Sequence, residues 1–108
     1  MPVRPIIWMG DSKRVVRSFA KPARQEVGFE LYRVQQGLYP RDWKPLPSVG
    51  PGVIEIRVHA GREYRILYVA KSQFGVCVLD AFVKKSRKTP AAAIALAKVR
   101  LKELLERF

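Results

Sequence analysis

The chain has 108 residues, with 21 Lys or Arg against 9 Asp or Glu, which gives a formal net charge of +12 at pH 7. This length fits one domain over residues 1–108 and excludes separate catalytic and binding modules, while a hydrophobic fraction of 48% excludes a disordered basic tail. Because so much positive charge on a small domain repels itself, the composition predicts a polyanionic partner such as RNA, DNA, an anionic membrane surface or an acidic protein.

The first part of the chain predicts a short strand and a helix. Residues 4–9 are mostly apolar and end at Gly10, which favours a strand. Asp11 or Ser12 is then expected to cap a helix over residues 13–20 with a side-chain oxygen. The apolar face of this helix would carry Val15, Val16 and Phe19.

A second helix is predicted to begin at Pro22, which suits a first helical turn, and to end at Gly37. Its apolar side chains recur at helical spacing: Ala23, Val27, Leu31 and Val34. Residues 38–52 contain four prolines, which excludes a helix or the interior of a sheet, so we expect a long loop. Three apolar side chains are expected to attach the loop to the body: Trp43, Leu46 and Val49.

The second half of the chain predicts an antiparallel three-strand meander followed by a helix. The strands are expected at residues 53–58, 63–69 and 76–85, with turns at 59–62 and 72–75. Thr89 would cap, and Pro90 would open, a last helix that docks through an apolar stripe: Ile94, Ala97, Leu101, Leu104 and Phe108. The predicted fold class is therefore α+β, with two N-terminal helices packed on an antiparallel sheet, made of the short first strand and the meander, and a C-terminal helix.

Burial suggests a register for the meander, because a slip of one residue would move every side chain to the opposite face. If Arg57 lies opposite Arg65, and Arg65 opposite Asp80, one face is almost wholly apolar. That face would carry Ile56, Val58, Tyr64, Ile66, Tyr68, Cys77, Leu79, Ala81 and Val83. The opposite, charged face would carry Glu55, Arg57, Arg65, Asp80, Phe82 and Lys84.

The charged face is the most informative feature of the sequence. Two arginines opposite one another repel, so Arg57 and Arg65 indicate an anion that satisfies both, and arginine forks suit phosphate. Phe82 offers a surface for base stacking. The patch is extended by Arg62, Lys84, Lys85, Arg87 and Lys88. The alternative interpretation is that Arg57 pairs with Glu55 or Asp80 and that the rest is a solvated face.

Other chemistries find little support in the sequence. It has no Cys and His cluster for zinc, no P-loop and no dinucleotide-binding glycine pattern, so we expect neither a metal nor a cofactor. The lone Cys77 in an apolar run predicts a buried thiol in a reducing compartment. The apolar group at residues 5–9 is too short for a signal peptide or a membrane span, so the expected location is the cytoplasm.

Two segments carry a resemblance to a known family: IEIRVHAGREYRILY at residues 54–68 and FVKKSRKTP at residues 82–90, followed by a helix containing AIALAKVRLKELLE. The chain resembles, over nearly its whole length, the HigB-like, phage-derived branch of the RelE/ParE toxin superfamily. The resemblance implies a RelE-like fold, ribosome-dependent cleavage of mRNA and neutralisation by a co-encoded antitoxin, often of helix-turn-helix type. The implied partners are thus the antitoxin, the ribosome and mRNA, with no membrane.

The resemblance maps onto Arg57, Arg65, Tyr68, Phe82, Lys84 and Lys85 of this chain. We interpret Tyr68 as structural, because the register places it on the apolar face. A metal-independent endoribonuclease needs positive charge at the phosphate, which Arg57, Arg65 and Lys84 would supply.

Groups for proton transfer are scarce in the sequence, and the candidates are His59, Asp80 or a lysine of lowered pKa. The residues expected to bind RNA are Arg62, Phe82, Lys85 and Arg87. The alternatives are a non-enzymatic, ParE-like toxin that inhibits DNA gyrase, or a simple nucleic-acid-binding module.

Overall fold

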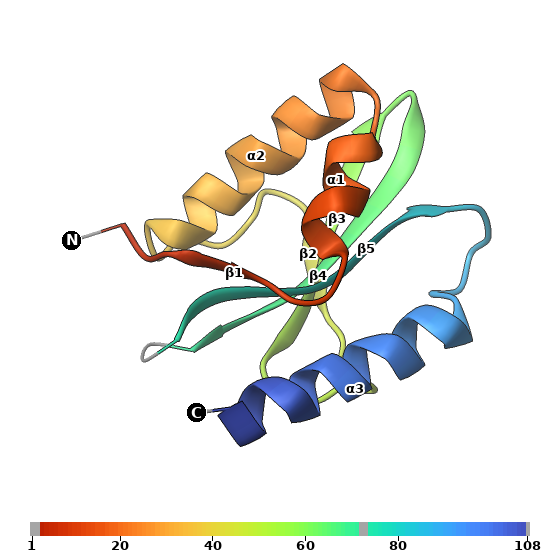
Figure 1. Cartoon of the computed structure of the whole chain (residues 1–108). Coiled ribbons are helices and arrows are strands. Elements are labelled where there is room, and N and C mark those ends of the chain that lie inside the picture. Colours follow the sequence, from red (N-terminus) through yellow and green to blue (C-terminus); the bar gives the residue numbers. More distant parts are fainter. Residues whose placement is uncertain (1–2, 72–73, 108) are drawn as a thin grey trace.

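A five-stranded sheet separates two layers of helix (Figure 1). The computed structural model describes residues 3–71 and 74–107. In chain order the elements are β1 (Ile6–Trp8), α1 (Ser12–Ser18), α2 (Lys21–Gln35), β2 (Trp43–Pro45), β3 (Val53–Ala60), β4 (Arg62–Lys71), β5 (Gly75–Lys84) and α3 (Ala91–Arg107). The α+β class predicted from the sequence is confirmed. Among the described residues no helix is both long and apolar enough to span a membrane.

The sheet has the strand order β1-β5-β4-β3-β2. Strands β3, β4 and β5 form the predicted antiparallel meander, whereas β1 pairs with β5 in parallel, so the sheet is mixed rather than antiparallel throughout. The predicted loop contains one further strand, β2, which pairs with β3 at the edge of the sheet. Pro45 is tolerated there because an edge strand leaves one row of backbone groups unpaired.

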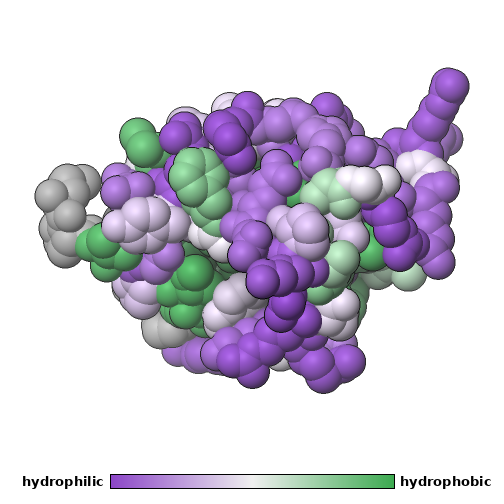
Figure 2. Space-filling model, turned by 90° about the horizontal axis from the view of Figure 1, so that it is seen from above, coloured by the Kyte–Doolittle hydropathy of each residue, from purple (hydrophilic) through white to green (hydrophobic). Residues whose placement is uncertain are grey.

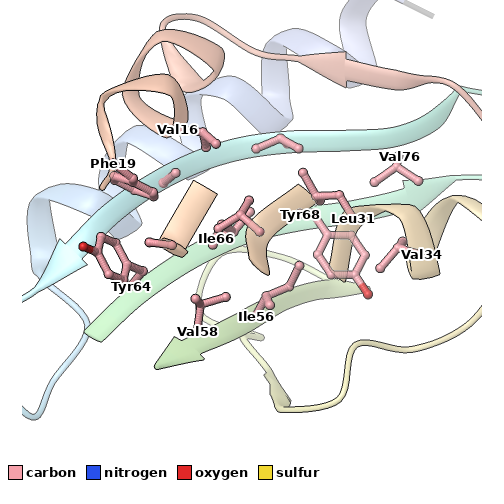
Figure 3. Close-up of a cluster of buried hydrophobic side chains, with 14 residues drawn as sticks. Val16, Phe19, Leu31, Val34, Ile56, Val58, Tyr64, Ile66, Tyr68 and Val76 are labelled. Carbon is pink, nitrogen blue, oxygen red and sulfur yellow. The ribbon is translucent and has the colours of Figure 1, made fainter. Parts of the chain in front are cut away.

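Helices α1 and α2 cover one face of the sheet and enclose the first of two cores (Figure 3). The whole predicted face of α2 is buried, as are Val16 and Phe19 around α1. From the sheet this core receives Ile56, Val58, Tyr64, Ile66, Tyr68, Val76, Val78 and Ala81. Seen from this side, the outer surface is mainly hydrophilic, with apolar residues in separate patches (Figure 2).

Helix α3 covers the other face and encloses a second core. The predicted stripe supplies Ala97, Leu101 and Leu104, with Ile94 partly buried, while Phe108 lies outside the described residues. The rest of this core is Met9, Leu46, Val49, Val53, Leu67, Val69, Cys77 and Leu79. The expectation of one apolar and one charged face was therefore wrong over this part of the sheet, which is apolar on both sides.

A β-bulge explains part of this difference. Arg57 lies opposite Arg65, as predicted, but Arg65 lies opposite Phe82 and not Asp80. The register then shifts between Leu67 and Tyr68, because Leu67 pairs with Asp80 and Tyr68 with Val78. The extra residue of a bulge reverses the alternation of side chains beyond it. Cys77 and Leu79, expected in the first core, consequently lie in the second.

The two predicted helix caps are also wrong. Neither Asp11 nor Ser12 caps α1 through its side chain, since the Ser12 hydroxyl donates to the carbonyl oxygen of Val78 at 3.3 Å. The Asp11 carboxylate instead accepts from Arg100 Nη2 at 2.7 Å. The Thr89 hydroxyl donates to Glu55 of the sheet at 2.7 Å, two residues before α3 begins.

Arg100 of α3 is a buried cation that joins the helix to the bulge. Its Nη1 donates to the carbonyl oxygen of Leu79 at 2.8 Å and lies 3.4 Å from Asp80 Oδ1. Burial raises the pKa of the Asp80 carboxyl, and the nearby Arg100 charge opposes that rise. Asp80 is thus the partner of a structural arginine.

Replacing Arg100 with methionine should lower the free energy of unfolding by about 3–5 kcal/mol at neutral pH, because the buried Asp80 loses its partner. The loss should shrink in acid, where Asp80 becomes protonated. Chemical denaturation at two pH values measures both effects. Lys102→Met, an exposed charge-matched change on the same helix, should have little effect, and an equally mild Arg100→Met would contradict this role.

Candidate nucleic-acid interface

A basic groove lies where strands β3, β4 and β5 meet the segment after β5. It has a volume of ≈ 550 Å³ and is lined by Arg57, Glu63, Arg65, Lys84, Lys85, Ser86 and Arg87. Five of the residues predicted to act on or bind RNA are brought together there: Arg57, Arg65, Lys84, Lys85 and Arg87. We call the seven lining residues together the basic groove.

The sheet register aligns the charges of the groove. Arg57 lies directly opposite Arg65, and Glu63 directly opposite Lys84. Because side chains alternate between faces along a strand, Glu63 and Arg65 on β4 point to the same face. Arg65 Nη1 donates to Glu63 Oε1 at 3.1 Å, so this ion pair follows from the spacing.

Arg65 forms the floor of the groove rather than its surface. Its side chain is 7% exposed, and Nη1 also donates to the carbonyl oxygen of Tyr64 at 2.9 Å. The Arg57 side chain is 33% exposed. The two arginines that the sequence treats as equivalent therefore differ, since Arg57 is the more accessible to a ligand.

A buried carboxylate lies beneath both arginines. Glu55 has no exposed surface, and its Oε1 is 3.8 Å from the Nε atoms of Arg57 and of Arg65. Lys44 Nζ of β2 is 3.7 Å from the same oxygen. From the sequence, Glu55 was predicted only to lie on the charged face and to pair with Arg57. Three residues of the site were not predicted: Lys44, Glu63 and Ser86. The spacing of two between Glu63 and Arg65 was the available signal for Glu63.

Lys84 has a lowered pKa, as the sequence-based hypothesis of a proton-transferring lysine requires. Its pKa is lowered by burial first and then by the neighbouring charges of Arg65, Lys44 and Arg57, while Glu55 opposes them. A lysine whose pKa moves toward neutrality loses and regains a proton more readily, which suits proton transfer.

His59 lies on β3 and not in a turn, because Gly61, with φ at +80°, closes the β3–β4 connection more tightly than predicted. Its Nδ1 is 2.8 Å from Glu63 Oε2 and its Nε2 is 2.6 Å from Asp42 Oδ2. These hydrogen bonds, first with Asp42 and then with Glu63, raise the pKa of His59. The ring does not line the groove and reaches it through Glu63.

Two predicted RNA-binding residues do not line the groove, although Phe82 lies directly opposite Arg65. Arg62 and Phe82 line a separate hollow of ≈ 440 Å³ beside Phe19 and Tyr64. Phe82 is partly buried against the second core, which limits the ring surface left for base stacking. Tyr68 is buried, in agreement with its interpretation as structural. Among the described residues, no group of three or more His, Cys, Asp or Glu side chains is placed to hold a metal ion.

His59 should make stability depend on pH. A raised histidine pKa adds stability that is complete below the unfolded value of 6.5 and is lost as pH rises through the folded value. His59→Gln should therefore lower the free energy of unfolding by about 0.2–1 kcal/mol near pH 5.5, the range for exposed ion pairs, and by almost nothing near pH 9. Urea unfolding at both pH values measures this, and an equal effect at each would contradict it.

Most of the chain matches the model of one protein family. Residues 14–102 match the model of the family described as phage derived protein Gp49-like. No curated protein sequence matches the chain. The matched range includes α2, the meander, most of α1 and α3, and every residue of the basic groove. The chain therefore belongs to the phage-derived Gp49-like family, which is a family of RelE-like toxins.

Proposed function

We propose that this protein is the toxin of a type II toxin-antitoxin pair and that it inhibits translation by cleaving mRNA on the ribosome. The observation that carries the proposal is the convergence of Arg57, Arg65, Lys84, Lys85 and Arg87 on one groove. Cations spread over the whole surface would favour simple attraction to nucleic acid, whereas cations that line one shallow, open groove suit phosphates held at defined positions. Membership of a RelE-like toxin family supports the same activity.

The proposed reaction is attack by an RNA 2′-hydroxyl on the adjacent phosphorus. The new bond joins the 2′-oxygen to phosphorus, the bond from phosphorus to the 5′-oxygen breaks, and the products are a 2′,3′-cyclic phosphate and a 5′-hydroxyl. Arg57 would contact the phosphate from the accessible side, and Arg65 would add positive charge from the floor. Lys85 and Arg87 would hold the neighbouring phosphates.

Lys84 is our candidate for the general acid that donates a proton to the leaving 5′-oxygen, because its pKa is lowered. Among the described residues that line the groove, Glu63 is the one carboxylate that could accept the proton of the 2′-hydroxyl. Hydrogen bonding to His59 lowers the pKa of Glu63 and makes that carboxylate a weaker base. We therefore assign the group that accepts the 2′-hydroxyl proton to the ribosome, which would complete the site and limit cleavage to ribosome-bound mRNA.

The same charges suggest how the toxin is controlled. An acidic segment of a co-encoded antitoxin, of helix-turn-helix type in this proposal, would occupy the groove and compete with RNA for Arg57, Lys84 and Lys85. Ribosomes and mRNA as targets place the activity in the cytoplasm. No bound metal is assigned a step in the reaction.

Lys84→Met should reduce mRNA cleavage on ribosomes by about 100-fold or more, because general acid catalysis contributes factors of that size. Its thermal unfolding should stay close to that of the parent protein, since the side chain is only partly buried. The matched control is Lys98→Met, an exposed lysine on α3, which should cleave normally.

Full cleavage by a folded Lys84→Met would remove Lys84 from the mechanism. A parent protein that arrests growth while protein synthesis continues would instead favour the gyrase-inhibiting alternative. Primer extension on ribosome-bound mRNA, together with the rate of amino-acid incorporation after induction, distinguishes these results.

A further inference from the structure

Three buried polar atoms gather beneath the basic groove without a hydrogen-bond partner in the described part of the chain: Glu55 Oε1, Arg57 Nε and Arg65 Nε. Each arginine Nε lies 3.8 Å from the Glu55 oxygen, which is an ion-pair distance but too long for a hydrogen bond. Unsatisfied buried polar groups are rare in folded proteins and call for an explanation. Here they mark one carboxylate shared between two arginines.

Sharing leaves the groove positively charged. Glu55 has Lys44, Arg57 and Arg65 within 4 Å of one oxygen, so one negative charge faces three positive charges. If each arginine had a carboxylate of its own, both positive charges would be neutralised. If there were no carboxylate at all, two like charges would repel one another across neighbouring strands. Glu55 reduces their repulsion and keeps a net attraction for an anion.

The second oxygen of Glu55 reaches the wall of the groove. Oε2 accepts a hydrogen bond from the Thr89 hydroxyl at 2.7 Å. Thr89 lies in the short segment between β5 and α3, and the same segment carries Lys85, Ser86 and Arg87 of the groove. One buried side chain therefore connects the arginines of the floor to the segment that forms the wall.

We propose that Glu55 is the positioning residue of the groove, which holds Arg57 and Arg65 from their Nε side and the Thr89 segment against them so that the cations converge on one phosphate. The proposal rests on the function proposed above. Glu55 is not a catalytic residue, because it has no exposed surface with which to touch RNA.

Lys84 supplies a readout that a merely structural role would not change. Burial, Arg65, Lys44 and Arg57 lower its pKa, and the Glu55 charge raises it. Neutralising Glu55 removes that opposing effect, so the pKa of Lys84 should fall. The limb of the pH–rate profile that reports Lys84 should then move to lower pH.

The experiment compares Glu55→Gln and Thr89→Val with the parent protein and with Glu103→Gln, a charge-matched change at an exposed position of α3. Ribosome-dependent cleavage is measured across a range of pH values. Glu55→Gln should lower kcat by about 10–100-fold, as expected for misplaced catalytic groups, with a smaller change in KM, and should shift the Lys84 limb to lower pH. Thr89→Val keeps the carboxylate and should lower kcat without moving the limb.

Parent-like kcat and an unmoved limb in a folded Glu55→Gln would overturn the proposal. Should Glu55→Gln not fold, Thr89→Val decides, and parent-like cleavage by that variant overturns the connection to the wall. Should the parent protein cut no RNA, the proposed function fails, and the positioning role is read from NMR signals of the Arg57 and Arg65 Nε–H groups. These N–H groups should be rigid in the parent and Glu103→Gln proteins and mobile in Glu55→Gln, which lacks the carboxylate, and in Thr89→Val, which lacks the hydroxyl that contacts it. Equal rigidity in all of these proteins would overturn the proposal.

Discussion

Two arginines lie opposite one another on the neighbouring strands β3 and β4, and the structure of the groove depends on how their electrostatic repulsion is offset. The β3–β4 register makes Arg57 and Arg65 neighbours. The apolar residues on either side of them in each strand are buried in the first core, and their burial fixes that register. Glu55 offsets part of the repulsion from below, and Glu63 adds a contact to Arg65 alone. The result is a buried arginine in the floor and a more accessible one beside it on the neighbouring strand.

Helix α3 confines the groove to one end of the sheet. Helix α3 covers the apolar part of the sheet face, where Leu67, Val69 and Leu79 lie, and leaves the charged end open. Arg100 attaches the helix to the β5 bulge, and the bulge turns Cys77 and Leu79 toward α3. The Thr89 contact with Glu55 then holds the segment between β5 and α3 against the sheet. Packing of α3 and formation of the groove are therefore parts of one arrangement.

Much of this was predictable from the sequence, because it depends on short-range patterns. The α2 face, the α3 stripe, the meander and the Arg57–Arg65 pair follow from side-chain periodicity and from burial. The three-residue strand β2 and the bulge near Leu79 were not predictable. A strand so short has no periodicity to detect, and an extra residue leaves the apolar pattern of β5 intact while reversing which core each side chain enters.

The candidate site was predictable in part for the same reason. The cations of the groove lie on neighbouring strands or in one segment, so their grouping follows from the register. The hydrogen bond between Glu55 and Thr89, the packing of Phe82 on the second core and the hydrogen bond between His59 and Asp42 are set by tertiary structure. Such contacts join residues far apart in the chain, and the pattern of a single strand does not contain them.

The central claim is that the basic groove holds RNA phosphates, and the salt dependence of RNA affinity tests it most directly. Binding of a single-stranded RNA oligonucleotide should weaken linearly on a double-logarithmic plot against salt, with a slope of roughly −0.7 for each phosphate contacted. Arg57→Ala should reduce the magnitude of that slope by about 0.7, which corresponds to the loss of one phosphate contact. Lys98→Ala, on the exposed side of α3, should leave the slope unchanged. Equal slopes for the parent protein and Arg57→Ala would contradict the account.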